Sequence, residues 1–242
     1  MTLLAQAGAA TAAEVKLSSS NGMKAVIEAL LPELERTTGH KLAITWDSAA
    51  VLKRQIEGGA PFDLAILTPA LVDDLAKQGK IAPGTVAGVA RSGIGIAIRA
   101  GAPKHDIGTP EAFKRTLLAA KSITYSKEGQ SGIYLERVIE RLGIAAEMTP
   151  KTIVQTVGGR ATAAVAAGEA ELGFQLMSEI LPVRGAELLG PLPAELQNYV
   201  VLTGGIGAAA KEPEAAKAVL QFLRTPAAAE VMKAKGMEAA AK

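Results

Sequence analysis

Short apolar segments of strand length alternate with amphipathic helical segments along almost the whole chain. Residues 15–17 form the first strand-like segment, and the apolar residues within 23–34 then recur at helical spacing. Segments 41–46 and 62–67 repeat the pattern, and each is followed by a helix-like segment. Strand–loop–helix units in close succession predict an α/β fold, in which a mostly parallel sheet is flanked by helices.

The same alternation continues toward the C-terminus and divides into two blocks, which are joined near residues 85–95 and 195–205. The strand-like segments of this part are 93–98, 123–125, 153–157, 172–176, 199–203 and 206–209. Two helix-like segments, 213–223 and one opened by Thr225-Pro226, end the chain. Because ligands bind at the carboxyl ends of the strands in open parallel sheets, we expect the functional residues in the loops that follow the strands.

The side chains available for catalysis or metal binding are few. The chain has no cysteine and only two histidines, His40 and His105, each next to a lysine in a turn-like stretch. With both histidines expected at the surface, a thiolate or zinc site and a Ser–His–Asp triad lack their residues. The segment 129–133 misses the nucleophile-elbow spacing by one residue. We therefore predict that the protein is not an enzyme and uses no metal and no cofactor.

The charge of the chain argues against one class of partner, and its N-terminal segment indicates an exported protein. The net charge of +2 and the aromatic content of 3% give no basis for binding nucleic acid. Residues 1–13 are uncharged and end in Ala10-Thr11-Ala12-Ala13, small residues at signal-peptidase spacing. We interpret 1–13 as the remnant of an export signal, with a flexible N-terminus as the alternative, and predict a periplasmic protein. No later apolar run reaches the roughly 18 residues that would predict membrane insertion.

Four small polar loops precede predicted helices, at 18–22, 47–50, 130–132 and 158–160. A helix N-terminus presents unpaired N–H groups and about half a positive charge, so several of them around one cleft can bind an anion without a metal. The alternative for each single loop is that its Ser, Asn and Gly residues only cap the helix. Both interpretations stay open on composition and spacing alone.

Three segments resemble one known family. They are 52–64 (LKRQIEGGAPFDL), close to the pattern LxRQIExGAPxDL, then 131–134 (SGIY) and 222–228 (FLRTPAA). Over about 15–236 the chain resembles the periplasmic molybdate-binding proteins of ABC transporters, which are type II periplasmic binding proteins.

The resemblance implies two α/β lobes, each a mostly parallel sheet flanked by helices, joined by two crossing hinge strands. Lobe 1 would comprise 14–85 plus 204–242, and lobe 2 would comprise 86–203 with the hinge strands. It further implies a monomer that closes on a small ligand and delivers it to a membrane permease.

The resemblance also places the ligand-binding residues in the four polar loops and at the end of the strand-like segment 172–176. Family members hold molybdate with a serine in each of the first two loops, backbone N–H groups in the next two and a final tyrosine. The matching positions and their neighbours here are Ser20, Asn21, Gly22, Ser48, Ala49, Ala50, Ser131, Gly132, Gly159, Arg160 and Gln175.

The chain departs from the family at two of these positions, where Ala50 replaces the second serine and Leu176 replaces the tyrosine. Each missing donor costs a buried oxyanion about 1–3 kcal/mol. Gln175 and Arg160 could instead bind a planar carboxylate, although Arg160 could equally form a surface or inter-lobe salt bridge. We therefore predict a solute-binding protein for a small organic carboxylate.

Three alternatives remain. The first is a receptor for molybdate, tungstate or sulfate with the same fold. The second is a small-molecule isomerase, which needs an acid–base group in the cleft. The third is the effector domain of a transcription regulator, which needs a helix-turn-helix segment ahead of residue 15.

Overall fold

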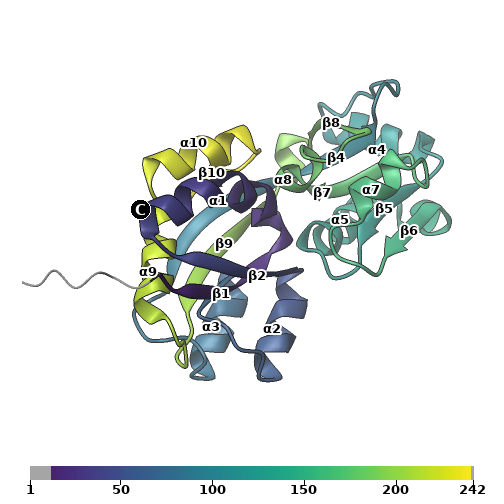
Figure 1. Ribbon diagram of the computed structural model, residues 1–242. Coiled ribbons are helices and arrows are strands. Elements are labelled where there is room, and N and C mark those ends of the chain that lie inside the picture. Colours follow the sequence, from purple (N-terminus) through teal and green to yellow (C-terminus); the bar gives the residue numbers. More distant parts are fainter. Residues whose placement is uncertain (1–11, 241–242) are drawn as a thin grey trace, which may run out of the picture.

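The computed structural model describes residues 12–240, so most of the predicted export-signal remnant, 1–13, lies outside the described residues. The strands form one continuous sheet in the order β2-β1-β3-β9-β4-β7-β5-β6, which is divided between two lobes (Figure 1). In the described part of the chain, no helix is long and apolar enough to cross a membrane.

The sheet of the first lobe begins with three parallel strands, β1 (Glu14–Ser20), β2 (Lys41–Asp47) and β3 (Leu64–Leu67). The four residues of β3 are all buried, and they alternate between two hydrophobic clusters. Leu64 and Ile66 join the larger cluster, whereas Ala65 and Leu67 join the smaller one. The unbroken apolar run of β3 therefore reflects a strand covered on both faces.

Helices cover both faces of this sheet (Figure 1). On the side of the larger cluster, the helices that cover the sheet of this lobe are α1 (Lys24–Thr38), α9 (Pro213–Phe222) and α10 (Pro226–Ala234). The helices of the smaller cluster are α2 (Ala49–Glu57) and α3 (Pro69–Lys77). The C-terminal helices thus return to the lobe that contains the start of the chain, which also includes the short strand β10 (Glu238–Ala239).

The second lobe is built around β7 (Leu172–Leu176), which pairs in parallel with β5 (Ile123–Ser126). Successive residues of β7 face opposite sides, as the pleat requires. Phe174 meets Phe113 of α4 (Pro110–Ala119) with ring centroids 6.1 Å apart. A Cβ atom on Gly173 would instead lie 2.8 Å from Val165 of α7 (Ala161–Ala166), so this glycine lets α7 approach the other face closely.

The remaining elements of this lobe complete the sheet and its cover. They are the strands β6 (Thr152–Gln155) and β8 (Ala186–Pro191), the helices α5 (Gln130–Arg141), α6 (Ala145–Met148) and α8 (Met177–Ile180), and the 3₁₀ turns η2 (Thr149–Lys151) and η3 (Ala194–Leu196). Strand β6 pairs in parallel with β5, at the edge of the sheet.

Two antiparallel strands, β4 (Ala87–Arg99) and β9 (Tyr199–Ile206), connect the lobes. The first half of β4 pairs with β9, and its second half pairs with β7 and β8. This confirms the predicted two-lobed α/β architecture with two crossing strands. The lobe limits 14–85 plus 204–242 and 86–203 stay a prediction, although the pairing of β9 with β3 ties β9 to the first lobe's sheet.

The prediction of separate strands at 199–203 and 206–209 is wrong. Strand β9 runs without interruption from Tyr199 to Ile206 and includes Gly204 and Gly205. A Cβ atom on Gly204 would lie 2.5 Å from Leu220 Cδ1, so this glycine permits close packing of α9 on the strand. A glycine in a strand-like segment often marks an interruption of the strand, but in β9 it permits close packing between a helix and the sheet.

Candidate functional site

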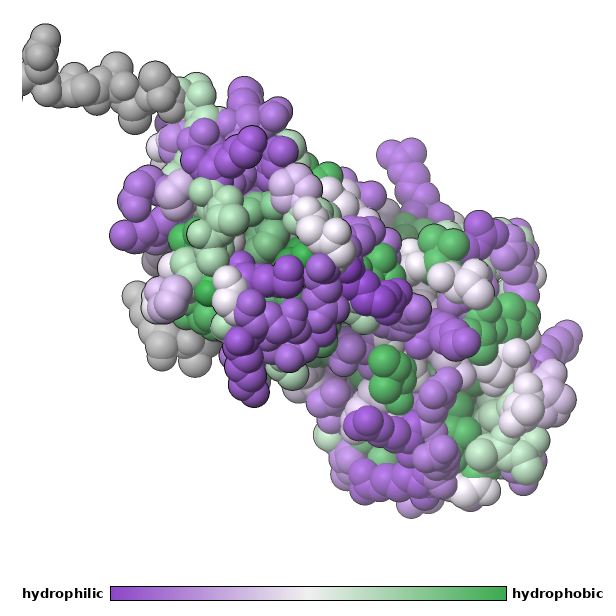
Figure 2. All heavy atoms as spheres, turned by 90° about the horizontal axis from the view of Figure 1, so that it is seen from below, coloured by the Kyte–Doolittle hydropathy of each residue, from purple (hydrophilic) through white to green (hydrophobic). Residues whose placement is uncertain are grey.

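A small crevice lies between the two lobes. Residues of both lobes line it: Ser20, Asn21, Ser48, Ala49, Thr68, Ser126, Glu128, Gly129, Gln130, Ser131, Gly158, Gly159, Gln175, Leu176, Glu179 and Val200. Most of them follow the carboxyl end of a strand, which is the expected position of a ligand site in a parallel sheet. Viewed from below, the two lobes meet at a narrow junction whose side chains are mostly hydrophilic (Figure 2).

The N-termini of three helices reach this crevice. Ser48 caps α2 through its Oγ, which accepts a hydrogen bond from Val51 N at 3.4 Å. Thr68 and Gly129 precede α3 and α5, and neither helix has a side-chain hydrogen bond at its N-cap. The first residue of α3, Pro69, has no N–H, so the free amides at these helix starts are Ala70 N of α3 and the first amides of α5, which lack the side-chain partner that α2 has. Simple capping explains the loop before α2 but not the other two.

The lobes touch across the crevice. A Cβ atom placed on Gly158 of the second lobe would lie 3.2 Å from Asn21 Nδ2, 3.3 Å from Asp47 Oδ1 and 3.4 Å from Ser48 N, all in the first lobe. At the mouth, Arg54 Nη2 forms an ion pair with Glu128 Oε2 at 2.6 Å, again between lobes. The structure therefore shows a closed arrangement.

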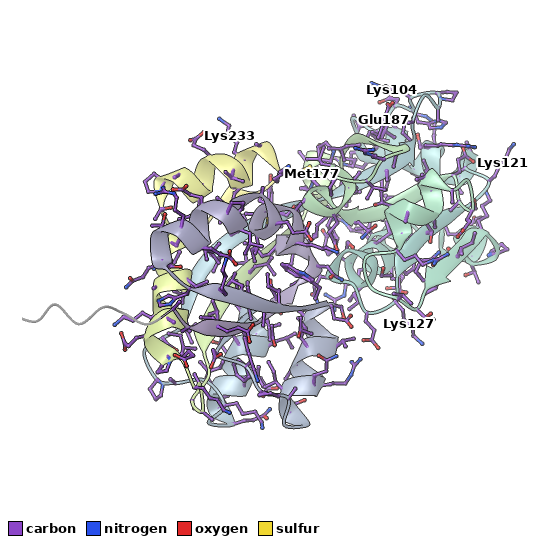
Figure 3. The ribbon with its side chains drawn as sticks, viewed as in Figure 1. Lys104, Lys121, Lys127, Met177, Glu187 and Lys233 are labelled. Atoms are coloured by element: carbon purple, nitrogen blue, oxygen red, sulfur yellow. The ribbon has the colours of Figure 1, made fainter. Side chains whose placement is uncertain are left out.

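Helix α8 lies at the junction of the lobes (Figure 1), and Met177 at its start occupies the same region in Figure 3. Met177 packs against β4, because Cβ atoms on Gly93 and Gly95 would both lie within 3.0 Å of its side chain. Ser178 Oγ donates a hydrogen bond to Gly22 O in the 3₁₀ turn η1 (Asn21–Met23) at 2.9 Å. Helix α8 thus connects the end of β7 to the first loop of the first lobe.

Seven of the residues predicted from the sequence line the crevice: Ser20, Asn21, Ser48, Ala49, Ser131, Gly159 and Gln175. The other four, Gly22, Ala50, Gly132 and Arg160, are not among its lining residues. The structure thus brings all four predicted loops to one crevice.

Gly22 and Gly132 serve packing. A Cβ atom on Gly22 would lie 2.8 Å from Leu176 Cδ1. On Gly132 it would lie 2.4 Å from Ser126 O and 2.6 Å from Tyr125 Cδ2, so only glycine lets α5 approach β5 this closely. Ala50 lies one residue beyond Ala49 in the first turn of α2, and only Ala49 lines the crevice.

Arg160 is exposed, and its guanidinium lies 3.5 Å from Glu169 Oε1 in the same lobe. This geometry supports the surface salt bridge that the sequence left open, and not a ligand contact. Gln175, in contrast, is buried, and its Oε1 accepts a hydrogen bond from Thr162 N at 2.5 Å. Its Nε2 group remains to donate toward Glu179 and the crevice.

Nine lining residues fell outside the predicted set: Thr68, Ser126, Glu128, Gly129, Gln130, Gly158, Leu176, Glu179 and Val200. Glu179 matters most, because it is a carboxyl group inside a crevice suited to anions. Although Glu179 keeps some exposure, burial raises its pKa to about 7, against the lowering effect of hydrogen bonds from Leu176 N–H and from Gln175. Its position just after β7 was the only sequence signal that could have indicated it.

Neither histidine, His40 or His105, lines the crevice. His40 Nδ1 accepts a hydrogen bond from Ala13 N at 3.3 Å, and His105 Nε2 lies 3.7 Å from Glu171 Oε1. Within residues 12–240 no three His, Asp or Glu side chains group as metal ligands would.

A two-lobed sheet with crossing strands and a crevice between the lobes defines a type II periplasmic binding protein. The chain belongs to the family described as bacterial extracellular solute-binding proteins, which matches residues 15–238. Among solved structures, it is similar to the periplasmic molybdate-binding protein of Azotobacter vinelandii, with a TM-score of 0.80, 21% identity and coverage of 94% of this chain and 99% of that one. The predicted fold and the resemblance to molybdate-binding proteins are confirmed.

Curated relatives carry two different names. The chain is 33% identical to a protein of Pseudomonas sp. named aconitate isomerase, over 91% of this chain and 86% of that protein. It is 28% identical to the molybdate-binding protein ModA of Azotobacter vinelandii, over 94% of this chain and 91% of that protein. The family is therefore one of solute-binding proteins, and one similar member is named for a reaction.

Proposed function

We propose that this protein captures a small organic carboxylate in the crevice between its lobes, as the receptor of an ABC-type uptake system. The observation that carries the proposal is the mixed lining of the crevice. Apolar side chains of Ala49, Leu176 and Val200 stand there beside amide and hydroxyl donors. A tetrahedral oxyanion presents oxygen in every direction, whereas an organic acid presents carboxylates and a carbon skeleton, which this lining can match separately.

Negative charge on the ligand is favoured by backbone dipoles. Among residues 12–240 no Lys or Arg lines the crevice, but the N-termini of α2, α3 and α5 open onto it. Their amides supply partial positive charge without a flexible cationic side chain. The relative named aconitate isomerase supports the ligand class, because aconitate is a small unsaturated tricarboxylate.

The receptor function has three consequences, which we also propose. The protein is exported to the periplasm, acts as a monomer, and delivers its ligand to a membrane permease. The two lobes, 14–85 plus 204–242 and 86–203, close around the ligand about the crossing strands β4 and β9. The contacts of Gly158 with the first lobe support this closure.

A thermal-shift screen followed by calorimetry tests the ligand class. We compare trans-aconitate, cis-aconitate and citrate with molybdate, tungstate and sulfate. A ligand at 100 times its Kd stabilises the folded state by about 2.7 kcal/mol, which raises Tm by several degrees in a chain of this size. Shifts from the tricarboxylates alone support the proposal. A shift from molybdate, tungstate or sulfate alone overturns it and assigns an oxyanion receptor.

A second candidate function is isomerisation of the bound acid, which one specific observation favours. Glu179 is a carboxyl in the crevice with a pKa of about 7, so it can both accept and donate a proton near neutral pH. In aconitate, removing a proton from the CH₂ carbon and returning one to the former vinylic carbon moves the double bond and balances all atoms. One such group suffices for cis–trans interconversion by this route. The relative named for this reaction supports the candidate.

Proton NMR in D₂O separates receptor from isomerase. For an isomerase, trans-aconitate incubated with the protein gives cis-aconitate and exchanges its CH₂ protons for deuterium, and Glu179→Gln abolishes both. Tight binding of trans-aconitate with neither conversion nor exchange excludes the isomerase and leaves the receptor.

A further inference from the structure

The crevice contains a carboxyl group whose charge opposes the ligand. Glu179 lines both the crevice and the adjoining groove, and its Oε2 atom accepts a hydrogen bond from Leu176 N at 3.3 Å. None of the ion pairs formed by residues 12–240 includes Glu179. An anion held in the same closed space would meet an uncompensated like charge, at low local dielectric.

Other charged groups around α8 are directed to other partners. In the crevice and the adjoining groove the charged neighbours are Glu128, which pairs with Arg54, and Lys24 and Glu28 of α1, whose charged groups lie 3.9 Å apart.

The strands packed against α8 also leave Glu179 without a cation. On β4, Arg91 pairs with Glu238, and Arg99 lies beside Gly168. On β8, Glu187 accepts a hydrogen bond from Gly101 N, and β7 carries no charge. The proton on Glu179 is therefore the available means of removing its charge.

We propose that Glu179 takes up one proton when the crevice binds its anion, and that the neutral carboxyl then donates a hydrogen bond to a carboxylate of the ligand. The inference rests on the proposed anion-binding function. For each ligand bound, one proton is taken from solvent and one O–H bond forms on Glu179. Glu179 would thus be a specificity-determining residue that selects ligands able to accept a hydrogen bond at this position.

The closed crevice is already poised for this step without a ligand. Burial raises the pKa of Glu179 to about 7, so the group is partly protonated at neutral pH before any anion arrives. A bound anion adds like-charge repulsion and raises the pKa further. Because the complex then holds more protons than the free protein, affinity falls as pH rises above about 7, by up to about tenfold for each pH unit.

Isothermal titration with trans-aconitate from pH 7 to 9 tests the inference, because the carboxyls of this ligand are essentially all ionised in this range. We expect the affinity to weaken steeply as the pH rises above 7. At pH 8, titrations in buffers of different ionisation enthalpy should show uptake of close to one proton per ligand.

Glu179→Gln is the decisive variant, because the amide keeps an acceptor for Leu176 N and a donor for the ligand but cannot titrate. It should bind trans-aconitate without proton uptake and with a pH-independent Kd. Glu128→Gln is the matched control; it removes the inter-lobe ion pair and can change Kd, but it should retain the parent's pH slope.

The possible failures are distinguishable. A flat pH profile without proton uptake in the parent overturns this inference alone, as does a Glu179→Gln variant that keeps the parent's slope. If trans-aconitate, citrate and molybdate all fail to bind at every pH, the anion-binding function fails, and the inference falls with it.

Discussion

Gly158 offers the sharpest test of closure, because the closed crevice leaves almost no room for a side chain there. Its backbone conformation is open to any residue, since it is not among the glycines with positive φ. A methyl group on Gly158 would approach three polar atoms of the opposite lobe at 3.2–3.4 Å, slightly closer than ordinary contact. We estimate a cost of about 1 kcal/mol for alanine and about 3 kcal/mol for valine, paid only in the closed state.

These energies translate into a graded loss of affinity. Gly158→Ala should weaken ligand binding about fivefold and Gly158→Val about 100-fold, because each 1.4 kcal/mol is a factor of ten in Kd. The Tm of the ligand-free protein should not change, since the added atoms meet only the opposite lobe.

Calorimetric Kd values and ligand-free Tm values measured on the same preparations check this prediction. Gly58→Ala is the matched control, because Gly58 has φ −72° and lies at the end of α2, outside the crevice lining. Unchanged affinity in Gly158→Val, with the fold intact, would refute the idea that the lobes close at this point to hold the ligand.

Three further predictions address single residues. Gly132→Ala should lower the unfolding free energy by about 1–3 kcal/mol, seen in denaturant titration, because its methyl group would lie 2.4 Å from Ser126 O. Asp63→Asn should destabilise the protein by about 1.5–3 kcal/mol in the same assay, since the buried carboxylate accepts three backbone N–H groups; an unchanged midpoint would contradict this. Arg160→Ala should leave Kd unchanged in calorimetry, because Arg160 faces Glu169; a tenfold loss would return it to the site.

The fold could be predicted from the sequence because its signals are local. The segment 52–64 shows why: Leu52 and Ile56 recur at helical spacing and are buried on α2, and Asp63 then ties the start of β3 to neighbouring backbone. Polar loops at helix starts likewise identified the crevice. The site could be located because strand ends converge at one edge in a parallel sheet.

Individual roles within the site were less accessible to sequence reasoning. A glycine in a polar loop can expose its backbone to a ligand or permit close packing, and Gly22 and Gly132 do the second. Glu179 was missed for another reason. Helix α8 has four residues, too few for a periodic pattern, and the environment of Glu179 comes from η1, β7 and the 158–159 turn, which are far apart in the sequence.

The absence of cationic side chains from the crevice lining links binding, release and proton uptake. Attraction from backbone dipoles falls steeply with distance, so the amides of α2, α3 and α5 can hold an anion only while the lobes are together. In the proposed receptor, opening would release the ligand without breaking a strong ion pair, which suits hand-over to a permease. The same closure removes water from Glu179 and favours its neutral form. In a receptor, the proton on Glu179 only neutralises the carboxyl. In an isomerase, Glu179 must also transfer a proton to a carbon atom of the ligand. The two proposed functions therefore differ in one proton transfer within the same closed crevice.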